Sequence, residues 1–152
     1  MGHMEIVGIR TDVAFNEMSE RIRSAGADAA LMDASVVFGR SHVISAMEHA
    51  ERSFRHGTNR SKTLLTEFLM YMAGERQISK ALERMKPKDN NIVAVLFSGD
   101  VSVFSGLGKR DDSLIDGTEE KAERMGLKKN GLGVSYEDLV LEMVAMLDIL
   151  KN

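Results

Sequence analysis

Three evenly spaced histidines are the first residues to test for metal chemistry. His42, His49 and His56 are seven residues apart, so on one helix they would share a face, with steps of about 10 Å along its axis. Histidine pairs that bind one metal ion from a helix are spaced i, i+4. We therefore expect partly exposed surface histidines and no metal site.

A glycine-rich stretch ending in lysine tests for a phosphate-binding loop. In Gly106-Leu107-Gly108-Lys109 the earlier glycine that such a loop needs is replaced by Val103, and the following Ser or Thr by Arg110. There is also no nucleophile-elbow motif. We expect no catalytic residues, no cofactor and no enzyme activity. The alternative is a small-molecule-binding α/β domain, or an enzyme whose site is assembled from dispersed residues.

Basic residues around residues 59–82 favour anion binding instead. Residues 51–88 contain nine Lys or Arg against four Glu, a local net charge of +5 in a chain of net charge −3. Two helix N-termini and several cations lying near one another would suit phosphate, because exposed N–H groups and the positive end of the helix dipole favour anions. The alternative is a solvated basic surface in which Arg76 pairs with Glu67 and Tyr71 fills a helix interface.

Hydrophobic periodicity and breakers predict the elements that would position these residues. Strands are expected at residues 5–10, 29–32, 36–38 and 92–97, with a further strand end at 101–104. Helices are expected at residues 15–25, from Gly39 with a Ser41 cap to Gly57, from Asn59 or Ser61 to Gly74, from Gln77 to Pro87, from Asp116 or Thr118 to Met125, and from a capping box at Ser135 to Leu150. This predicts one α/β domain over residues 4–152, with a small sheet covered by several helices.

The last expected helix is apolar around nearly its whole circumference. Such a helix is either deeply buried or docks a partner with its second face, and both readings stay open. The residues expected on that second face are Val140, Met143, Val144 and Leu147.

Composition excludes several classes of protein. The chain has 152 residues, 43% of them hydrophobic, and no cysteine, so disulfide frameworks and thiolate metal sites are excluded. Residues 1–3 are expected to be an expression tag. We find no apolar run of membrane-spanning length and no signal peptide, and we expect a cytoplasmic protein without membrane contact. The net charge argues against a protein that coats nucleic acids generally.

The central stretch resembles a known family. Its motif comprises Asn59-Arg60-Ser61, Thr66-Glu67, Tyr71, Gly74, Arg76-Gln77-Ile78 and Ala81-Leu82. It looks like the smallest core subunit of the KEOPS complex, the PRPK-binding protein family, and the chain most resembles an archaeal member. The apolar run into Gly39-Arg40 and the apolar strand at 92–97 are also similar.

The resemblance implies a non-enzymatic subunit with two partners. Such proteins bind and stimulate the small atypical kinase/ATPase of the complex, and they capture the single-stranded 3′ CCA end of tRNA. The complex forms threonylcarbamoyladenosine at tRNA position 37. Carried onto this chain, the tRNA contacts would be Asn59, Arg60, Lys62, Arg76, Gln77 and Lys80. The kinase would dock on Val140, Met143, Val144 and Leu147, and the isolated chain could dimerise weakly. The competing hypothesis is a kinase-binding module with no RNA role.

Overall fold

The computed structural model describes residues 4–129 and 133–151, and the expected tag at residues 1–3 lies outside them. The chain divides into two compact units, residues 1–34 with 86–115, and residues 35–85 with 116–152. A small sheet and several helices are present, which confirms the α/β expectation. The expectation of one domain over residues 4–152 stays a prediction.

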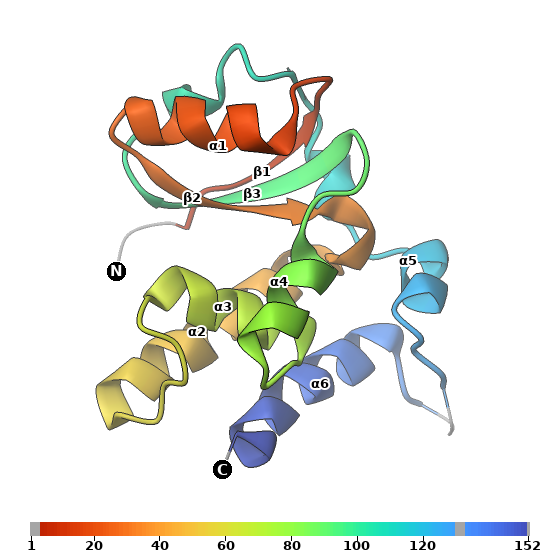
Figure 1. The fold of residues 1–152 in the computed structure, drawn as a ribbon. Helices are drawn as coiled ribbons and strands as arrows, with labels where there is room; N and C mark the ends of the chain where they lie inside the picture. Colours follow the sequence, from red (N-terminus) through yellow and green to blue (C-terminus); the bar gives the residue numbers. More distant parts are fainter. Residues whose placement is uncertain (1–3, 130–132, 152) are drawn as a thin grey trace. The chain divides into compact units, whose positions relative to one another are not determined.

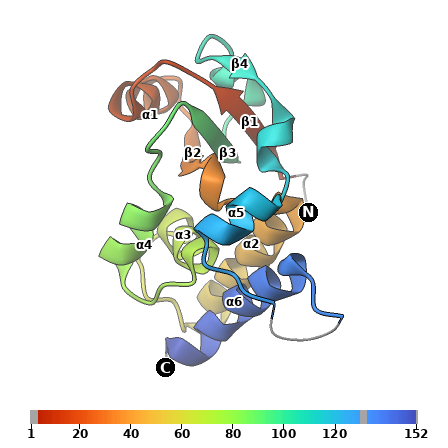
Figure 2. The same ribbon diagram turned by 90° about the vertical axis from the view of Figure 1, so that its right-hand side faces the viewer.

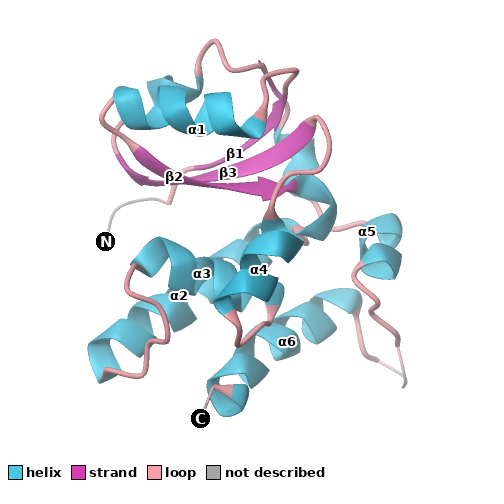
Figure 3. Ribbon diagram, in the orientation of Figure 1, coloured by secondary structure: helices cyan, strands magenta, loops and turns pink. Residues whose placement is uncertain are grey.

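The first unit is built on a four-stranded antiparallel sheet in the order β2-β3-β1-β4. The strands are β1 (Ile6–Arg10), β2 (Asp28–Asp33), β3 (Asn91–Ser98) and β4 (Lys109–Arg110). β3 lies between β2 and β1, as its uninterrupted apolar sequence predicts, because a central strand is paired on both edges. The strands are magenta in Figure 3.

One helix, α1 (Phe15–Ser24), covers a face of this sheet, as Figure 1 shows. Met18 and Ile22 are one helical turn apart and are both buried, so they form the apolar stripe that the spacing predicts. They pack against Val7, Ile9 and other buried side chains of the unit.

Two of the strand predictions, for residues 36–38 and 101–104, are wrong. Residues 36–38 do not continue as a strand, because the chain turns through a short 3₁₀ helix, η1 (Ala34–Val36). Val101–Phe104 is also a 3₁₀ helix, η2, started by the Asp100 carboxylate accepting from the Ser102 N–H at 2.8 Å. A further 3₁₀ turn, η3 (Asp112–Ile115), follows β4. β-branched residues in such short runs do not outweigh local capping.

The second unit is helical in the residues that the structure describes. Its helices are α2 (Gly39–His56), α3 (Leu64–Ala73), α4 (Ile78–Met85), α5 (Glu119–Arg124) and α6 (Tyr136–Leu150). α3 packs against α2, α4 and α6, and α6 also packs along α2. Figure 2 shows these helices from a second side.

Several of the expected helix caps and stops are present in this unit. Gly57 and Gly74 are left-handed stops after α2 and α3, and Ser135 forms the expected capping box with Asp138. The Thr118 cap of α5 is also confirmed. Residues 128–133 form a basic, glycine-rich segment that the sequence predicts to be a linker, and they lie partly outside the described residues.

Two expected N-caps are wrong. α2 starts at Gly39 without a side-chain cap, so Ser41 lies inside the helix, where its hydroxyl donates to Glu137 at 2.7 Å. α3 starts later than expected, because Thr63 rather than Asn59 or Ser61 accepts from the Thr66 N–H. The residues before Thr63 are therefore a loop.

Candidate functional site

The loop between α2 and α3 carries three of the predicted tRNA contacts. Arg60 and Lys62 are exposed and Asn59 is half-buried. The Asn59 side-chain amide donates to the carbonyl of Ser61 at 2.9 Å, and Arg60 Nε donates to the carbonyl of Lys151 at 3.1 Å. Asn59 and Arg60 thus help to build the loop, and Lys62 presents its ammonium group to solvent.

The turn between α3 and α4 carries the other three. Arg76, Gln77 and Lys80 are exposed, and their side chains make no hydrogen bond or ion pair with any described residue. On α4 the exposed Ile78 and Leu82 are one turn apart, so they share one side of the helix. This end of the unit combines cations, an amide and apolar surface.

The structure separates these two groups of predicted contacts. The loop precedes α3 and the turn follows it, and the ten residues of α3 span about 15 Å. The start of α4 lies near the end of α3, since only residues 74–77 join them. The expectation that two helix N-termini lie together is therefore wrong, because a short turn places the start of one helix beside the end of the other.

Glu67 fixes the loop between α2 and α3 through hydrogen bonds to its backbone. Its side chain is fully buried, and its Oε1 accepts from the N–H of Arg60 at 3.0 Å and from the N–H and hydroxyl of Ser61, each at 2.9 Å. Its Oε2 accepts from the Ser53 hydroxyl at 3.1 Å and from the Lys151 ammonium. Glu67 is therefore paired with Lys151, and the alternative pairing with Arg76 is wrong.

This carboxylate is charged in the folded protein. Burial acts to raise the pKa of Glu67, but hydrogen bonds from Lys151 and Ser61 outweigh burial and lower that pKa. A buried carboxylate with five donors and a buried ammonium partner meets the requirement that interior charges be paired and hydrogen-bonded.

A second set of polar groups continues from Lys151 across the helices. Lys151 Nζ donates to the Tyr71 hydroxyl at 3.0 Å, Tyr71 donates to Asp148, and Asp148 Oδ2 lies 2.7 Å from His49 Nδ1. Burial and Asp148 raise the pKa of Tyr71, so the phenol keeps its proton. Tyr71 is buried in the helix interface, as the structural alternative expected.

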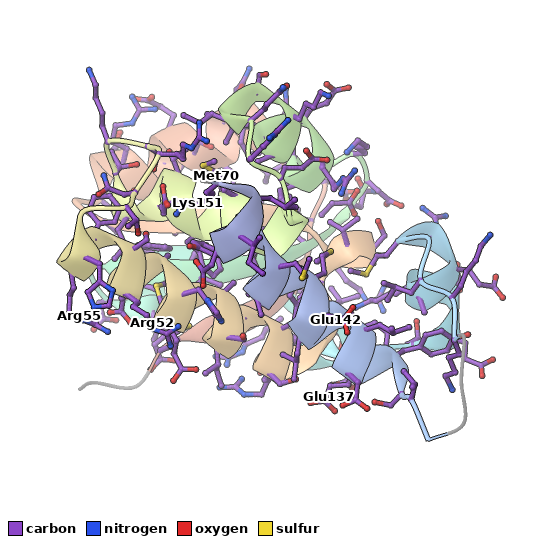
Figure 4. The ribbon with its side chains drawn as sticks, turned by 90° about the horizontal axis from the view of Figure 1, so that it is seen from below. Arg52, Arg55, Met70, Glu137, Glu142 and Lys151 are labelled. Atoms are coloured by element: carbon purple, nitrogen blue, oxygen red, sulfur yellow. The ribbon has the colours of Figure 1, made fainter. Side chains whose placement is uncertain are left out.

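A hollow of about 200 Å³ opens beside this network. It is lined by Arg52, Ser53, His56, Thr58, Asp148 and Lys151. Figure 4 shows Lys151 at the end of α6 and Arg52 and Arg55 on α2. Four titratable groups converge here, which is the feature that a dispersed enzyme site would need. Asp148 and Lys151 are already engaged by His49, Tyr71 and Glu67, so the hollow is a weak candidate for catalysis.

The sequence interpretation missed Glu67 and Lys151 as a pair. A signal for Glu67 was present, because it is the one charged residue in the mostly apolar α3 sequence LLTEFLMYMA. Lys151 gave no such signal, since a lysine after the last helix is indistinguishable from a solvated tail.

The histidines are arranged differently from the expectation of surface residues. His42 is fully buried, where its Nδ1 accepts from the Phe38 N–H and its Nε2 donates to the Met72 carbonyl, both at 3.0 Å. Burial lowers the pKa of His42 to about 4. His49 is engaged by Asp148, and His56 is exposed. Within residues 4–129 and 133–151, no three His, Cys, Asp or Glu side chains gather as a metal site.

A model of the family described as "Kinase binding protein CGI-121" matches residues 11–149. The chain belongs to the CGI-121 family. It is also similar to "Regulatory protein Cgi121" of Methanocaldococcus jannaschii, with 29% identity over 156 aligned residues that cover 98% of this chain and 100% of the archaeal protein. These matches confirm the family resemblance.

Helix α6 of this CGI-121 family member does not present the expected docking face. Val140, Val144 and Leu147 are 0–1% exposed and belong to the core, and Met143 is half-buried against Gly74. The expected docking face is wrong because its apolar residues pack against α2 and α3. The exposed large apolar residues of α6 are instead Met146, Ile149 and Leu150.

Two other hollows bear on the small-molecule alternative. One of about 150 Å³ is lined mainly by methionines of the helical unit together with Arg84 and Arg124. Another of about 380 Å³, in the sheet unit, is lined by Val7, Phe104 and other residues, with Arg110 as its titratable group. Neither gathers an acid and a base. No helix in the described part of the chain is long and apolar enough to span a membrane.

Proposed function

We propose that this chain is a non-catalytic regulatory subunit of the KEOPS complex. It binds and activates the small atypical kinase/ATPase of that complex, and it captures the tRNA 3′ CCA end for threonylcarbamoyladenosine formation at position 37. The match of residues 11–149 to a family described as kinase-binding carries the proposal. Alignment over the full length of an archaeal regulatory protein supports a regulatory role without catalysis.

The RNA surface in this proposal centres on the turn before α4. Arg76 and Lys80 supply cations without internal partners, Gln77 supplies an amide, and the neighbouring Ile78 supplies apolar area for a base. Lys62 adds a cation at the other end of α3. Asn59 and Arg60 contribute through the shape of the loop, and the remaining guanidinium donors of Arg60 stay available to phosphate, since guanidinium carries five N–H donors.

Charge reversal at Arg76 tests the RNA surface. The probe is tRNA with and without its 3′ CCA, titrated with wild type, Arg76→Glu and Lys128→Glu across a range of salt concentrations. Lys128 is an exposed lysine that follows α5 and is not one of the proposed contacts, and its reversal changes the net charge by the same amount. Arg76→Glu should weaken binding of the CCA-bearing tRNA and flatten its salt dependence by roughly 0.7 per lost phosphate contact. Equal affinity of all three proteins, or no preference for CCA, would reject this surface.

The kinase face in this proposal moves from the buried stripe of α6 to its exposed apolar residues. Met146, Ile149 and Leu150 are 42%, 66% and 46% exposed. Exposed large apolar side chains grouped at one helix end are typical of protein interfaces. The same residues would account for weak dimerisation of the isolated chain.

Aspartate substitution at Ile149 tests this face. Ile149→Asp should abolish co-purification with the kinase and stimulation of its ATPase, while the circular dichroism spectrum stays that of the wild type. Leu82→Asp is the matched control, because Leu82 is also exposed but lies on α4. Retained kinase binding by folded Ile149→Asp would remove the face from the proposal.

A second candidate function is a kinase-binding module that never contacts RNA, in the same cytoplasmic setting. The net charge of −3 favours it, as does the use of Asn59 and Arg60 inside the loop. Kinase binding together with identical, weak affinity for tRNA with and without CCA would establish this candidate.

A further inference from the structure

We infer that Lys151 is a positioning residue that, through Glu67, couples the C-terminal turn of α6 to the loop carrying Lys62. The inference rests on the proposed RNA role of that loop. It concerns the part of the second unit where α2, α3 and α6 share one buried carboxylate.

The first step is that one ion pair fixes two backbone amides of the loop. Glu67 Oε1 receives the N–H groups of Arg60 and Ser61, and Glu67 Oε2 receives the Lys151 ammonium. Glu67 and Lys151 are 0% and 3% exposed. If the ammonium is removed, the carboxylate keeps its desolvation cost without its counter-charge, so ionisation of Glu67 becomes less favourable. The acceptor that fixes the loop then weakens.

The second step is that the contact runs in both directions. The Arg60 guanidinium donates to the backbone carbonyl of Lys151, with Nε at 3.1 Å. The loop thus holds the last turn of α6, and that turn holds the loop. Lys62 follows Ser61 directly, so the direction of its exposed side chain depends on how Arg60 and Ser61 are fixed.

The third step concerns what precedes Lys151 in the sequence. Ile149 and Leu150 are the exposed apolar residues next to it, and Asp148 and Lys151 both contact Tyr71. A partner that packs on Ile149 and Leu150 acts on the same helical turn that supplies the ammonium. Occupancy of that turn and the conformation of the loop are therefore linked, and linkage of this kind is reciprocal.

The test removes the pair without leaving a buried charge. The double variant Lys151→Met, Glu67→Gln keeps side-chain size and leaves an amide oxygen for the loop. The matched control is Lys128→Met, which removes one exposed positive charge. Amide hydrogen exchange is measured at Arg60 and Ser61 and, as a reference for the helix, at Phe68 and Met70. Affinity is measured for a single-stranded RNA ending in CCA, with Arg76→Glu titrated in parallel.

The double variant is expected to exchange Arg60 and Ser61 at least tenfold faster, with protection of Phe68 and Met70 retained, and to bind the RNA three- to tenfold more weakly. Lys128→Met should change neither quantity. Unchanged exchange at Arg60 and Ser61 overturns the inference, as does faster exchange with unchanged RNA affinity. If Arg76→Glu still weakens binding in that case, only the inference fails. If wild type itself fails to bind the RNA, the proposed function fails with it.

Discussion

Glu67 and Lys151 lie 84 residues apart in the sequence and form a buried ion pair between the first turn of α3 and the end of α6. The same carboxylate accepts hydrogen bonds from Ser53 at the end of α2 and from the loop amides. One side chain thus links three segments, and the stability of the helical unit should depend on it.

Replacing one residue of this ion pair should destabilise the protein more than replacing both residues. Lys151→Met leaves an uncompensated buried carboxylate and should lower the free energy of unfolding by about 3–5 kcal/mol. Adding Glu67→Gln should restore part of this loss, because no buried charge remains. Urea denaturation of both single variants and the double variant gives the coupling energy. Strictly additive losses would mean that the two residues do not interact.

The contribution of Glu67 to the free energy of unfolding should be lost as the pH falls. The pKa of Glu67 is lowered in the folded state, so the unfolded chain binds more protons at mildly acid pH. Its contribution is complete above its unfolded pKa and is lost as pH falls through the lower folded pKa. The free energy of unfolding of wild type should therefore fall more steeply below about pH 4.5 than that of Glu67→Gln. The same pH dependence of unfolding free energy in wild type and Glu67→Gln would contradict this prediction.

His42 should make the protein less stable at mildly acid pH, over a higher range than Glu67. Burial lowers its pKa from 6.5 to about 4, so the unfolded state takes up a proton between these values and the folded state does not. Stability should fall by about 3 kcal/mol as pH drops from about 6.5 to about 4. Denaturation at several pH values measures this. His42→Gln should flatten this pH dependence, and a variant slope as steep as that of the wild type would contradict the prediction.

Gly74 should tolerate alanine less well than Gly57. Both have left-handed backbones, with φ of 64° and 68°, so either substitution should cost about 1–2 kcal/mol. A Cβ at Gly74 would also lie 2.6 Å from Met143 Cγ, whereas a Cβ at Gly57 meets nothing within 4 Å. Thermal denaturation should therefore show the lower Tm for Gly74→Ala. Adding Met143→Ala should narrow the difference that the steric clash causes, and an unchanged difference would exclude the clash as its cause.

Thr63 should be the residue that stabilises the start of α3. Its hydroxyl accepts from the Thr66 N–H at 3.2 Å, so Thr63→Ala should lower the free energy of unfolding by about 1 kcal/mol. Lys62→Ala, one residue earlier and exposed, should change stability by less than about 0.5 kcal/mol. Chemical denaturation distinguishes these outcomes, and an equal loss from both variants would exclude the cap.

Local sequence signals predicted most elements of this protein. The stops at Gly57 and Gly74, the capping box at Ser135 and the central strand β3 depend on residues close together in the chain, so sequence pattern was sufficient. The start of α3 was placed too early, because Asn59, Ser61 and Thr63 are all competent caps and the Glu67 carboxylate decides between them by holding Arg60 and Ser61 in a loop.

The exposed cations of the candidate site were also readable from sequence. Arg76, Gln77 and Lys80 are polar residues beside a glycine stop, where exposure is the expected outcome. Arg76 and Gln77 also belong to the motif between Asn59 and Leu82 that carried the family resemblance, and the matches confirmed that resemblance. By itself, the sequence therefore determined the fold class, the helix stops at Gly57 and Gly74 and the family.

Only the tertiary structure decided which apolar and charged residues are inside. Val144 and Ile149 look equivalent on a helix that is apolar around most of its circumference, yet one is core and the other 66% exposed, because packing against α2 and α3 selects one side of α6. Lys151 is buried because a carboxylate from a distant segment meets it there. Such pairings depend on contacts between residues far apart in the chain, which no local pattern encodes.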